Sequence, residues 1–340
     1  MTPQWRGAIV GFGQVASQGH WPAWHRQPDF RIVAVCEPDP MRQQCARETI
    51  PSVRLYDSLD ELLAREDVDF VDIATPPAMH AAQVLAAARA RVHVLCEKPL
   101  TTSFAEFEEM QRAVRAAGVV LHTVHNWRFS EAFRALRAEM QREEFGALHS
   151  ITLETLRAGC APGAGGLWRL DAGLAGGGIL VDHGWHAFYL MAELAGEPPR
   201  TISASVERQR YLDAPVEDTA RCRLAFSSCV GKIHLTWAAT TRRTVWHIAA
   251  EHGELRLENS RLFVRGRKRE RQLELPSPAV GSHHPDWFDG VIGEFRSALR
   301  APELTVGNIR EAGLCVALLE HAYRSAEENG RTLSVQLPRV

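Results

Sequence analysis

The sequence predicts an α/β protein in two parts: an N-terminal doubly wound parallel sheet, then an α+β domain with a large open, mostly antiparallel sheet. Up to about residue 125, apolar strand-like runs alternate with helical patterns, which is typical of βαβ units around a parallel sheet. From about residue 147, strand-like runs follow one another without helices between them, which favours an antiparallel sheet. We therefore expect one domain at residues 1–125 and a second at residues 126–340.

The strands expected in the first half are short, continuous apolar runs, which indicates burial on both faces of a sheet. They lie at residues 8–10, 31–37, 69–75, 92–97 and 119–125, and the clearest helical patterns between them lie at 79–91 and 104–118.

The strands expected in the second half are longer and lie at residues 148–156, 201–211, 219–226, 229–238, 245–251, 261–266 and 271–275. A helical pattern at 179–196 interrupts them, and two more follow at 286–300 and 308–328. Helices on one face leave the other face of the sheet open. If that face is apolar it must be buried against another subunit, so we expect a homodimer or homotetramer.

The composition excludes several classes of partner. The chain has 340 residues, with 39 Lys and Arg against 41 Asp and Glu, and it contains no basic block that would bind nucleic acid. No apolar run reaches the roughly 18 residues of a membrane helix, and the start "MTPQWRG" does not resemble a signal peptide. We expect a cytoplasmic protein without a membrane partner, whose seven cysteines are reduced and not catalytic.

The stretch "GFGQVA" (11–16) directly follows the first expected strand. Gly11, Gly13 and Ala16 fit the G-x-G-x-x-G/A spacing, in which the glycines permit a tight turn and the close approach of a pyrophosphate. The phosphates would lie at the N–H groups of the following helix. An ordinary glycine-containing turn is the alternative. The alternation of strands and helices favours a dinucleotide site.

Glu37 ends the second expected strand, 21 residues after Ala16. In dinucleotide-binding folds, an acidic residue about 20 residues further along the chain binds the ribose hydroxyls of the adenosine. A carboxylate repels a 2′-phosphate, so the expected cofactor is NAD rather than NADP. Asp39 is an alternative ribose ligand.

Two further stretches, "TPPAMH" (75–80) and "CEKPL" (96–100), follow the third and fourth expected strands. Ligands bind at the carboxyl ends of strands in such sheets, so both stretches are placed to meet the cofactor. Lys98 precedes a proline and is therefore biased to an extended backbone that aims its amine away from the sheet. A solvated lysine is the alternative, and Glu97 is a candidate partner for the amine.

In "GGGILVDHGWH" (176–186), Asp182 and His186 stand four residues apart, so a helix would place both on one face. Such a pair can bind a hydroxyl and accept its proton. The alternatives are a structural pair and a metal site at His183 and His186. We predict no metal because too few other ligands lie at suitable spacing; the role of His283 and His284 is left open.

Together the stretches "GFGQVA", "TPPAMH", "CEKPL", "HNWRF" (125–129) and "GGGILVDHGWH" resemble the Gfo/Idh/MocA family of NAD(P)-dependent oxidoreductases over essentially the whole chain. The resemblance implies a Rossmann domain and a substrate domain, and it implies Lys98, Asp182 and His186 as the catalytic set. The implied reaction is hydride transfer between the nicotinamide and a secondary hydroxyl of a sugar, cyclitol or sugar derivative.

In this reaction His186 would be the general base, since an imidazole with a reference pKa near ~6.5 suits proton transfer around neutrality. Lys98 would stabilise the charge that develops on the oxygen, and Asp182 would orient the imidazole or the amine. The substrate pocket is expected to comprise Lys98, Trp127, Trp168, Arg169, Asp182 and His186. For Trp127 and Trp168, packing in the hydrophobic core is the alternative role.

The expected cofactor contacts are Gly11, Phe12, Gly13, Gln14, Val15, Ala16, Glu37, Thr75, Pro76, His80, Glu97, Lys98, Asn126 and Arg128. Two other functions stay open. One is an NAD-dependent glycosidase that acts through transient sugar oxidation, and the other is a sugar-sensing regulator without turnover. The sequence does not identify the sugar or cyclitol.

Overall fold

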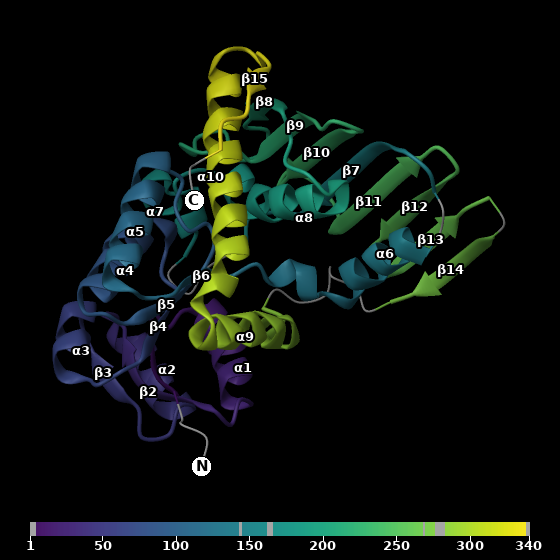
Figure 1. Cartoon of the computed structure of the whole chain (residues 1–340). Helices are drawn as coiled ribbons and strands as arrows, with labels where there is room; N and C mark the ends of the chain where they lie inside the picture. Colours follow the sequence, from purple (N-terminus) through teal and green to yellow (C-terminus); the bar gives the residue numbers. More distant parts are fainter. Residues whose placement is uncertain (1–4, 143–144, 162–165, 268, 276–282, 338–340) are drawn as a thin grey trace.

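The computed structural model of the chain contains one parallel and one mostly antiparallel sheet, which confirms the predicted fold class (Figure 1). It describes residues 5–142, 145–161, 166–267, 269–275 and 283–337. All seven cysteines are free thiols. Within the described ranges, no helix combines the length and the apolar character that crossing a membrane requires.

The first sheet has six parallel strands in the order β3-β2-β1-β4-β5-β6. Their bounds are β1 Trp5–Val10, β2 Phe30–Cys36, β3 Arg54–Tyr56, β4 Phe70–Ile73, β5 His93–Cys96 and β6 Leu121–Thr123. Strand β3 was not predicted, because three residues carry too little pattern to separate a strand from a loop. The strand order reverses between β1 and β4, and ligands of such sheets bind at that point.

Helices on both faces connect these strands: α1 Trp21–His25, α2 Pro40–Thr49, α3 Leu59–Arg65, α4 His80–Arg89 and α5 Phe104–Ala117. A π-helical turn, Ala16–His20, precedes α1. Polar side chains begin three of the helices, because Asp39, Ser58 and Ser103 each accept a hydrogen bond from a backbone N–H of the first turn. The short helix α3 was not predicted.

The second sheet has nine strands in the order β14-β13-β12-β11-β7-β10-β9-β8-β15. Only β7 and β10 pair in parallel. The bounds are β7 Leu148–Leu156, β8 Thr201–Glu207, β9 Thr219–Ala225, β10 Val230–Thr236, β11 Arg243–Ala250, β12 Gly253–Glu258, β13 Arg261–Arg265, β14 Glu270–Glu274 and β15 Leu333–Ser334. Strand β12 was missed by the sequence analysis.

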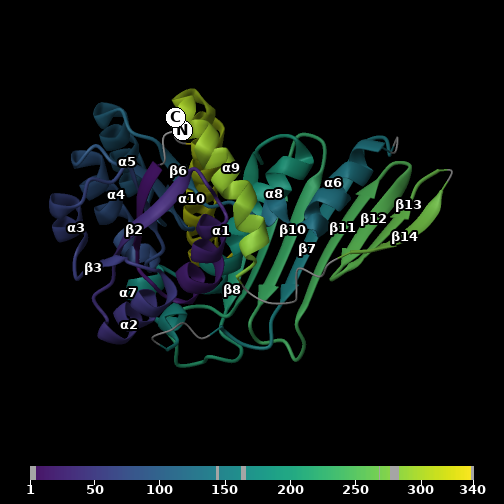
Figure 2. The ribbon, with the colours of Figure 1, turned by 90° about the horizontal axis from the view of Figure 1, so that it is seen from below.

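Helices α6 Glu131–Arg142 and α8 Trp185–Ala195 cover one face of this sheet, whereas the other face is open (Figure 2). The strands alternate accordingly: Ile151 and Leu153 of β7 are buried, while Thr152 and Glu154 between them are partly exposed. The amphipathic helix α6 was not predicted.

The two late helices do not simply cover the second sheet, as we had expected. Helix α9 (Pro285–Arg300) packs on the first sheet, where Phe295 contacts Phe70 edge to face at 5.6 Å between ring centroids. Helix α10 (Thr305–Glu327) joins both sheets: Asn308 accepts a hydrogen bond from the Thr123 backbone, and Ser325 accepts one from the Ala204 backbone. The chain therefore returns to the first sheet after building the second.

Candidate active site

The glycine turn after β1 has the features that a dinucleotide requires. Gly11 has φ +86°, and a Cβ there would lie 2.9 Å from the Thr75 side chain, so the fold itself demands glycine. Gly13 is different, because a Cβ there would have no neighbour within 4 Å. The helix that follows begins at Gln14 with backbone N–H groups that have no partner inside the helix. The open space and these donors fit a pyrophosphate.

Glu37 lies beside this turn, as the sequence predicted, but it is already engaged. One carboxylate oxygen accepts the Phe12 N–H at 2.8 Å, and the other accepts the Asp39 N–H at 3.0 Å. Asp39, the alternative ribose ligand, caps helix α2 by accepting the Arg42 N–H. Because each carboxylate oxygen has two lone pairs, Glu37 retains the capacity to accept a ribose hydroxyl.

The loops after β4 and β5 are joined by His80. Its side chain is buried, with Nδ1 2.8 Å from the Pro99 carbonyl and Nε2 2.9 Å from the Thr75 carbonyl. Both ring nitrogens therefore face backbone oxygens, and the cofactor contact of His80 stays a prediction. Its position explains why the two loops lie together. Thr75 donates its hydroxyl to Gln83.

Arg128 is held by carboxylates of two helices. The side chain belongs to the 3₁₀ turn Asn126–Phe129, and its Nη2 lies 2.6 Å from both carboxylate oxygens of Glu311 in α10. Glu193 of α8 lies 3.5 Å away. The cofactor contact of Arg128 stays a prediction. Asn126, in the same turn, has a buried side-chain oxygen without a hydrogen-bond partner.

The catalytic candidates Lys98 and Asp182 meet between the two sheets. The Lys98 amine donates to the Asp182 backbone oxygen at 2.8 Å and to a carboxylate oxygen at 3.1 Å. Arg169 Nε lies 3.6 Å from the other carboxylate oxygen. Burial would raise the pKa of Asp182, but Lys98, Arg169 and His183 lower it to well below its ordinary value. Asp182 is therefore an anion held by cations from both halves of the chain.

His186 lies at the start of α8, against the face of Trp127. The two rings are stacked with centroids 4.6 Å apart, and His186 Nδ1 lies 3.2 Å from the Tyr189 hydroxyl oxygen. Burial, reinforced by Lys98 and His183, lowers the pKa of His186 to well below 6.5. His186 is thus neutral at physiological pH, which is the form that a general base requires.

Asp182 and His186 have different side-chain partners. A π-helical turn, Leu180–Gly184, lies between them and alters the angular spacing of an ordinary helix. The Asp182 side chain accepts a hydrogen bond from Lys98, whereas the His186 ring lies at hydrogen-bond distance from the Tyr189 hydroxyl. Asp182 therefore orients the amine, and Tyr189, which the sequence analysis missed, orients the imidazole.

A buried histidine on the first sheet was also missed. His20 Nδ1 lies 2.9 Å from the Asp72 carboxylate and its Nε2 lies 3.1 Å from the Glu97 carboxylate, whose other oxygen accepts the Lys98 N–H at 2.8 Å. Burial alone would lower the pKa of His20, but Asp72 and Glu97 raise it to about 9. A cationic imidazole thus fixes the residue next to Lys98. The signal in the sequence was Asp72, an acid inside a buried strand.

The remaining candidates line the same region. Trp168 is half-buried beneath the Arg169 guanidinium, 4.5 Å from the ring centroid, so core packing does not describe it. His284 stacks on Trp287 at 3.6 Å, and Trp287 meets Trp127 edge to face. No group of three or more His, Cys, Asp and Glu side chains in the described part of the chain could hold a metal ion.

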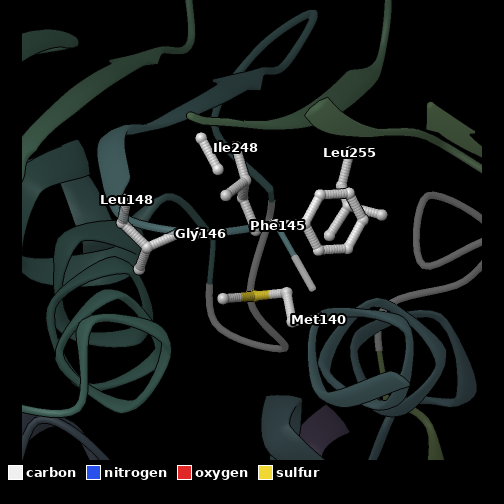
Figure 3. A pocket seen from close by; sticks show the side chains of 7 residues that line it. Met140, Phe145, Gly146, Leu148, Ile248 and Leu255 are labelled. Atoms are coloured by element: carbon white, nitrogen blue, oxygen red, sulfur yellow. The ribbon is translucent and has the colours of Figure 1, made fainter. Parts of the chain in front are cut away.

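A cavity of about 380 Å³ lies away from this centre, between α6 and the second sheet (Figure 3). Its lining is apolar and contains Met140, Phe145, Gly146, Leu148, Ile248, Ala250 and Leu255. None of these described lining residues is an acid, a base or a charged group, so the cavity is not our candidate for the reaction site.

Two models of one protein family match this chain. Residues 5–125 match the "Oxidoreductase family, NAD-binding Rossmann fold" model of GFO_IDH_MocA, and residues 133–256 match the "GFO/IDH/MocA C-terminal domain" model. Between them the two models cover the first sheet, most of the second sheet up to residue 256, and the catalytic candidates Lys98, Asp182 and His186.

Curated relatives and solved structures agree with these models. The chain is 26% identical to the "Putative UDP-kanosamine synthase oxidoreductase subunit" of Amycolatopsis mediterranei, over 94% of this chain and 96% of that protein. It is 38% identical to the "1,5-anhydro-D-fructose reductase" of Ensifer adhaerens, over 58% of this chain and 59% of the reductase. An oxidoreductase from Agrobacterium radiobacter, solved with NAD+, L-tartaric acid and magnesium, has the same fold (TM-score 0.83, 23% identity, 97% of this chain and 98% of that one).

Proposed function

Because this chain belongs to the Gfo/Idh/MocA family of oxidoreductases with an NAD-binding Rossmann fold, we propose that it transfers a hydride between NAD and a secondary hydroxyl carbon of a sugar, cyclitol or sugar derivative. The observation that carries this proposal is the contact of Lys98 with Asp182 beside a neutral, buried His186. Two relatives are named for reactions of sugar derivatives, which supports a polyol substrate.

NAD fits the residues of the first half. The space at Gly13, the N–H groups of the turn Gln14–Ala16 and the Glu37 carboxylate are the features that would hold it, with Thr75, Pro76, Glu97 and Asn126 around them. When bound, NAD supplies the hydride acceptor. Residues 1–125 would hold the cofactor and residues 126–340 the substrate.

Lys98 stabilises the substrate oxygen in this mechanism. An ammonium has three N–H donors, and Asp182 accepts from two of them. The third donor is available for the reacting hydroxyl and for the negative charge that develops on its oxygen. Removal of bulk water by burial strengthens this interaction.

His186 accepts the proton of the hydroxyl at Nε2. For this the ring must be the tautomer that carries its proton on Nδ1 and donates it to the Tyr189 oxygen. That oxygen also accepts the Trp127 N–H at 3.1 Å, which favours it as an acceptor. Tyr189 thus selects the tautomer in which Nε2 is a base.

The test is a screen of aldoses, cyclitols and sugar acids with NAD and NADP in parallel, in which NADH and the oxidised product are both measured. The proposal requires that at least one class of compound yields NADH and the oxidised product in equal amounts. Cleavage of a glycoside without net NADH would instead indicate the redox-assisted glycosidase. Binding of sugars without any turnover would indicate the regulator.

The open face of the second sheet bears on assembly. The predicted homodimer or homotetramer required an apolar face, but this face carries charged pairs such as Arg221 with Glu207 at 2.8 Å and His247 with Glu254 at 2.9 Å. A homo-oligomer and a cytoplasmic location stay predictions. Sedimentation at micromolar concentration tests the first, and a monodisperse monomer would contradict it.

A further inference from the structure

Two arginines of the second half lie near Asp182, and they come from different segments. Arg169 approaches the carboxylate from the turn Trp168–Leu170, and 17% of its side chain is exposed. Arg157 follows β7 directly, and its Nη1 donates to the Leu156 and Arg243 carbonyls at 2.9 and 3.1 Å. The chain from Arg157 to Ala161 links the two, because the Ala161 carbonyl accepts from Arg169 at 3.4 Å.

Arg157 is a buried cation with unused donors. It is 4% exposed, and its Nε and Nη2 have no hydrogen-bond partner. Within the part of the chain that the structure describes, no carboxylate forms an ion pair with it. Buried donors and buried charges without partners destabilise a folded protein, so an anion that binds Arg157 would stabilise it.

The charges around the catalytic centre do not balance. Asp182 is a single carboxylate, and Lys98 and Arg169 both lie within 4 Å of it. Arg157 and Lys98 also act on the pKa of the neighbouring His183, and both oppose the effect of Asp182 there. Asp72 and Glu97 share the single cation His20, so this cluster carries one negative charge that offsets part of the charge of Lys98. With the charge of Asp182 added, one positive charge among Lys98, Arg169 and Arg157 is still not offset within this group.

We propose that the substrate carries an anionic group, a carboxylate or a phosphate, in addition to the hydroxyl that is oxidised, and that Arg169 and Arg157 bind this group. The inference rests on the proposed function, whose site it deepens. Arg169 is the more exposed of the two and makes the first contact. Arg157 adds a second charge and the three N–H donors of its Nε and Nη2, in a region from which water is excluded and where charge-assisted hydrogen bonds are strong.

The phosphates of the cofactor are a different anion, and they are bound elsewhere. The cradle that fits them lies at Gly11–Gly13 on the first sheet, whereas Arg157 follows a strand of the second. Substitution of Arg157 should therefore leave the affinity for NAD unchanged.

The test compares matched substrate pairs that differ only in charge: hexuronates with their amides, aldonates with their lactones, and sugar phosphates with the free sugars. We expect kcat/KM for the anionic member of the preferred pair to exceed that of its neutral partner by at least about tenfold. The carboxylate and phosphate pairs distinguish the two sources of charge. Equal or higher kcat/KM for the neutral members overturns the inference.

Variants assign the effect to the arginines. Arg157→Gln should reduce the anion preference by about tenfold, while Arg157→Lys retains most of it and Arg221→Gln, on the open sheet face, changes nothing. NAD affinity and thermal stability report whether each variant is folded. If Arg157→Gln does not fold, Arg169→Gln is tested in its place.

Calorimetry in the presence of NADH measures binding without turnover. Binding of the anionic members with no oxidation of any compound would contradict the proposed function and leave this inference standing. Binding of neither member, or equal binding of both, overturns the inference.

Discussion

The helical segment that contains Ala16–His20 and the one that contains Leu180–Gly184 begin in the same way but have different roles. Each follows a glycine-rich turn, and each contains a π-helical turn, at Ala16–His20 and at Leu180–Gly184. Each also supplies a histidine to the catalytic region, His20 on the first sheet and His186 on the second. π-helical turns are rare and are found often at functional sites, so their occurrence at both helices fits a shared task.

Gly11 of the first turn is required by the fold, but Gly13 of that turn and Gly178 of the second turn contrast with each other. A Cβ at Gly13 would meet nothing within 4 Å, so the protein leaves that space open. A Cβ at Gly178 would lie 1.8 Å from the Glu217 carbonyl, and the Glu217 carboxylate accepts the N–H groups of Gly178 and Leu180. The first turn is therefore shaped for a ligand, and the second is filled by the protein itself.

The two histidines differ in charge for an equally local reason. Both are buried, and burial lowers the pKa of each. His20 faces two carboxylates and becomes a cation, whereas His186 faces Lys98 and remains neutral. The charged groups around each histidine, rather than its burial or its sequence motif, therefore decide its protonation. They make His20 of the first helix a fixed cation and His186 of the second helix a neutral base.

The largest effect expected from this comparison concerns the second helix. His186→Ala should reduce kcat by roughly 10²- to 10⁴-fold, the usual contribution of a positioned general base. Lys98→Ala should be at least as damaging, because it also removes charge stabilisation. Steady-state kinetics with NAD affinity as the control checks both. Near-normal turnover of His186→Ala would make His186 a structural residue.

The contrast between Gly178 and Gly13 predicts two smaller effects: substitution of Gly178 should reduce stability, and substitution of Gly13 should reduce NAD binding. Gly178→Ala should lower the free energy of unfolding by about 1–3 kcal/mol, because the new Cβ overlaps backbone atoms. Gly13→Val should abolish NAD binding with little change in stability. Gly293→Ala, where a Cβ also meets nothing within 4 Å, is the matched control. If Gly13→Val leaves NAD affinity unchanged, the phosphate cradle lies elsewhere.

The two histidines should give opposite dependences of stability on pH. The pKa of His20 is raised from 6.5 to about 9, so its contribution is complete below pH 6.5 and is lost as the pH rises through 9. The pKa of His186 is lowered, so stability falls as the pH drops below 6.5. Each slope is at most about 1.4 kcal/mol per pH unit. Denaturant titrations measure the free energy of unfolding at each pH. His20→Gln should remove the fall in this free energy above pH 6.5 and leave the fall below pH 6.5 in place. An unchanged pH dependence in His20→Gln would contradict the assignment.

The smallest predicted effect is the choice of cofactor at the first helix. Glu37 should make NAD bind more tightly than NADP by about 1 kcal/mol or more. Calorimetry with both dinucleotides checks this, and Glu37→Gln should narrow the difference. Equal affinity of the native protein would show that the carboxylate serves only the Phe12 and Asp39 N–H groups.

The sequence predicted the architecture because periodic apolar runs and glycine spacing are local signals. Short elements such as β3, and the attachment of α9 to the first sheet, were missed because they depend on contacts distant in the chain. The same limit applied to the site. Lys98, Asp182 and His186 were found from motifs, but the partners of His186 and His20 depend on tertiary packing. The π-helical turns leave no pattern that single-sequence reasoning detects.

The most direct test of the central claim is the transfer of deuterium from the reacting carbon of the substrate to the cofactor. With the preferred sugar or cyclitol labelled at its secondary hydroxyl carbon, the account predicts deuterated NADH in an amount equal to the ketone formed. Lys98→Ala should abolish this transfer while NAD remains bound. Product formation without label in the cofactor, or full transfer by Lys98→Ala, would contradict the account.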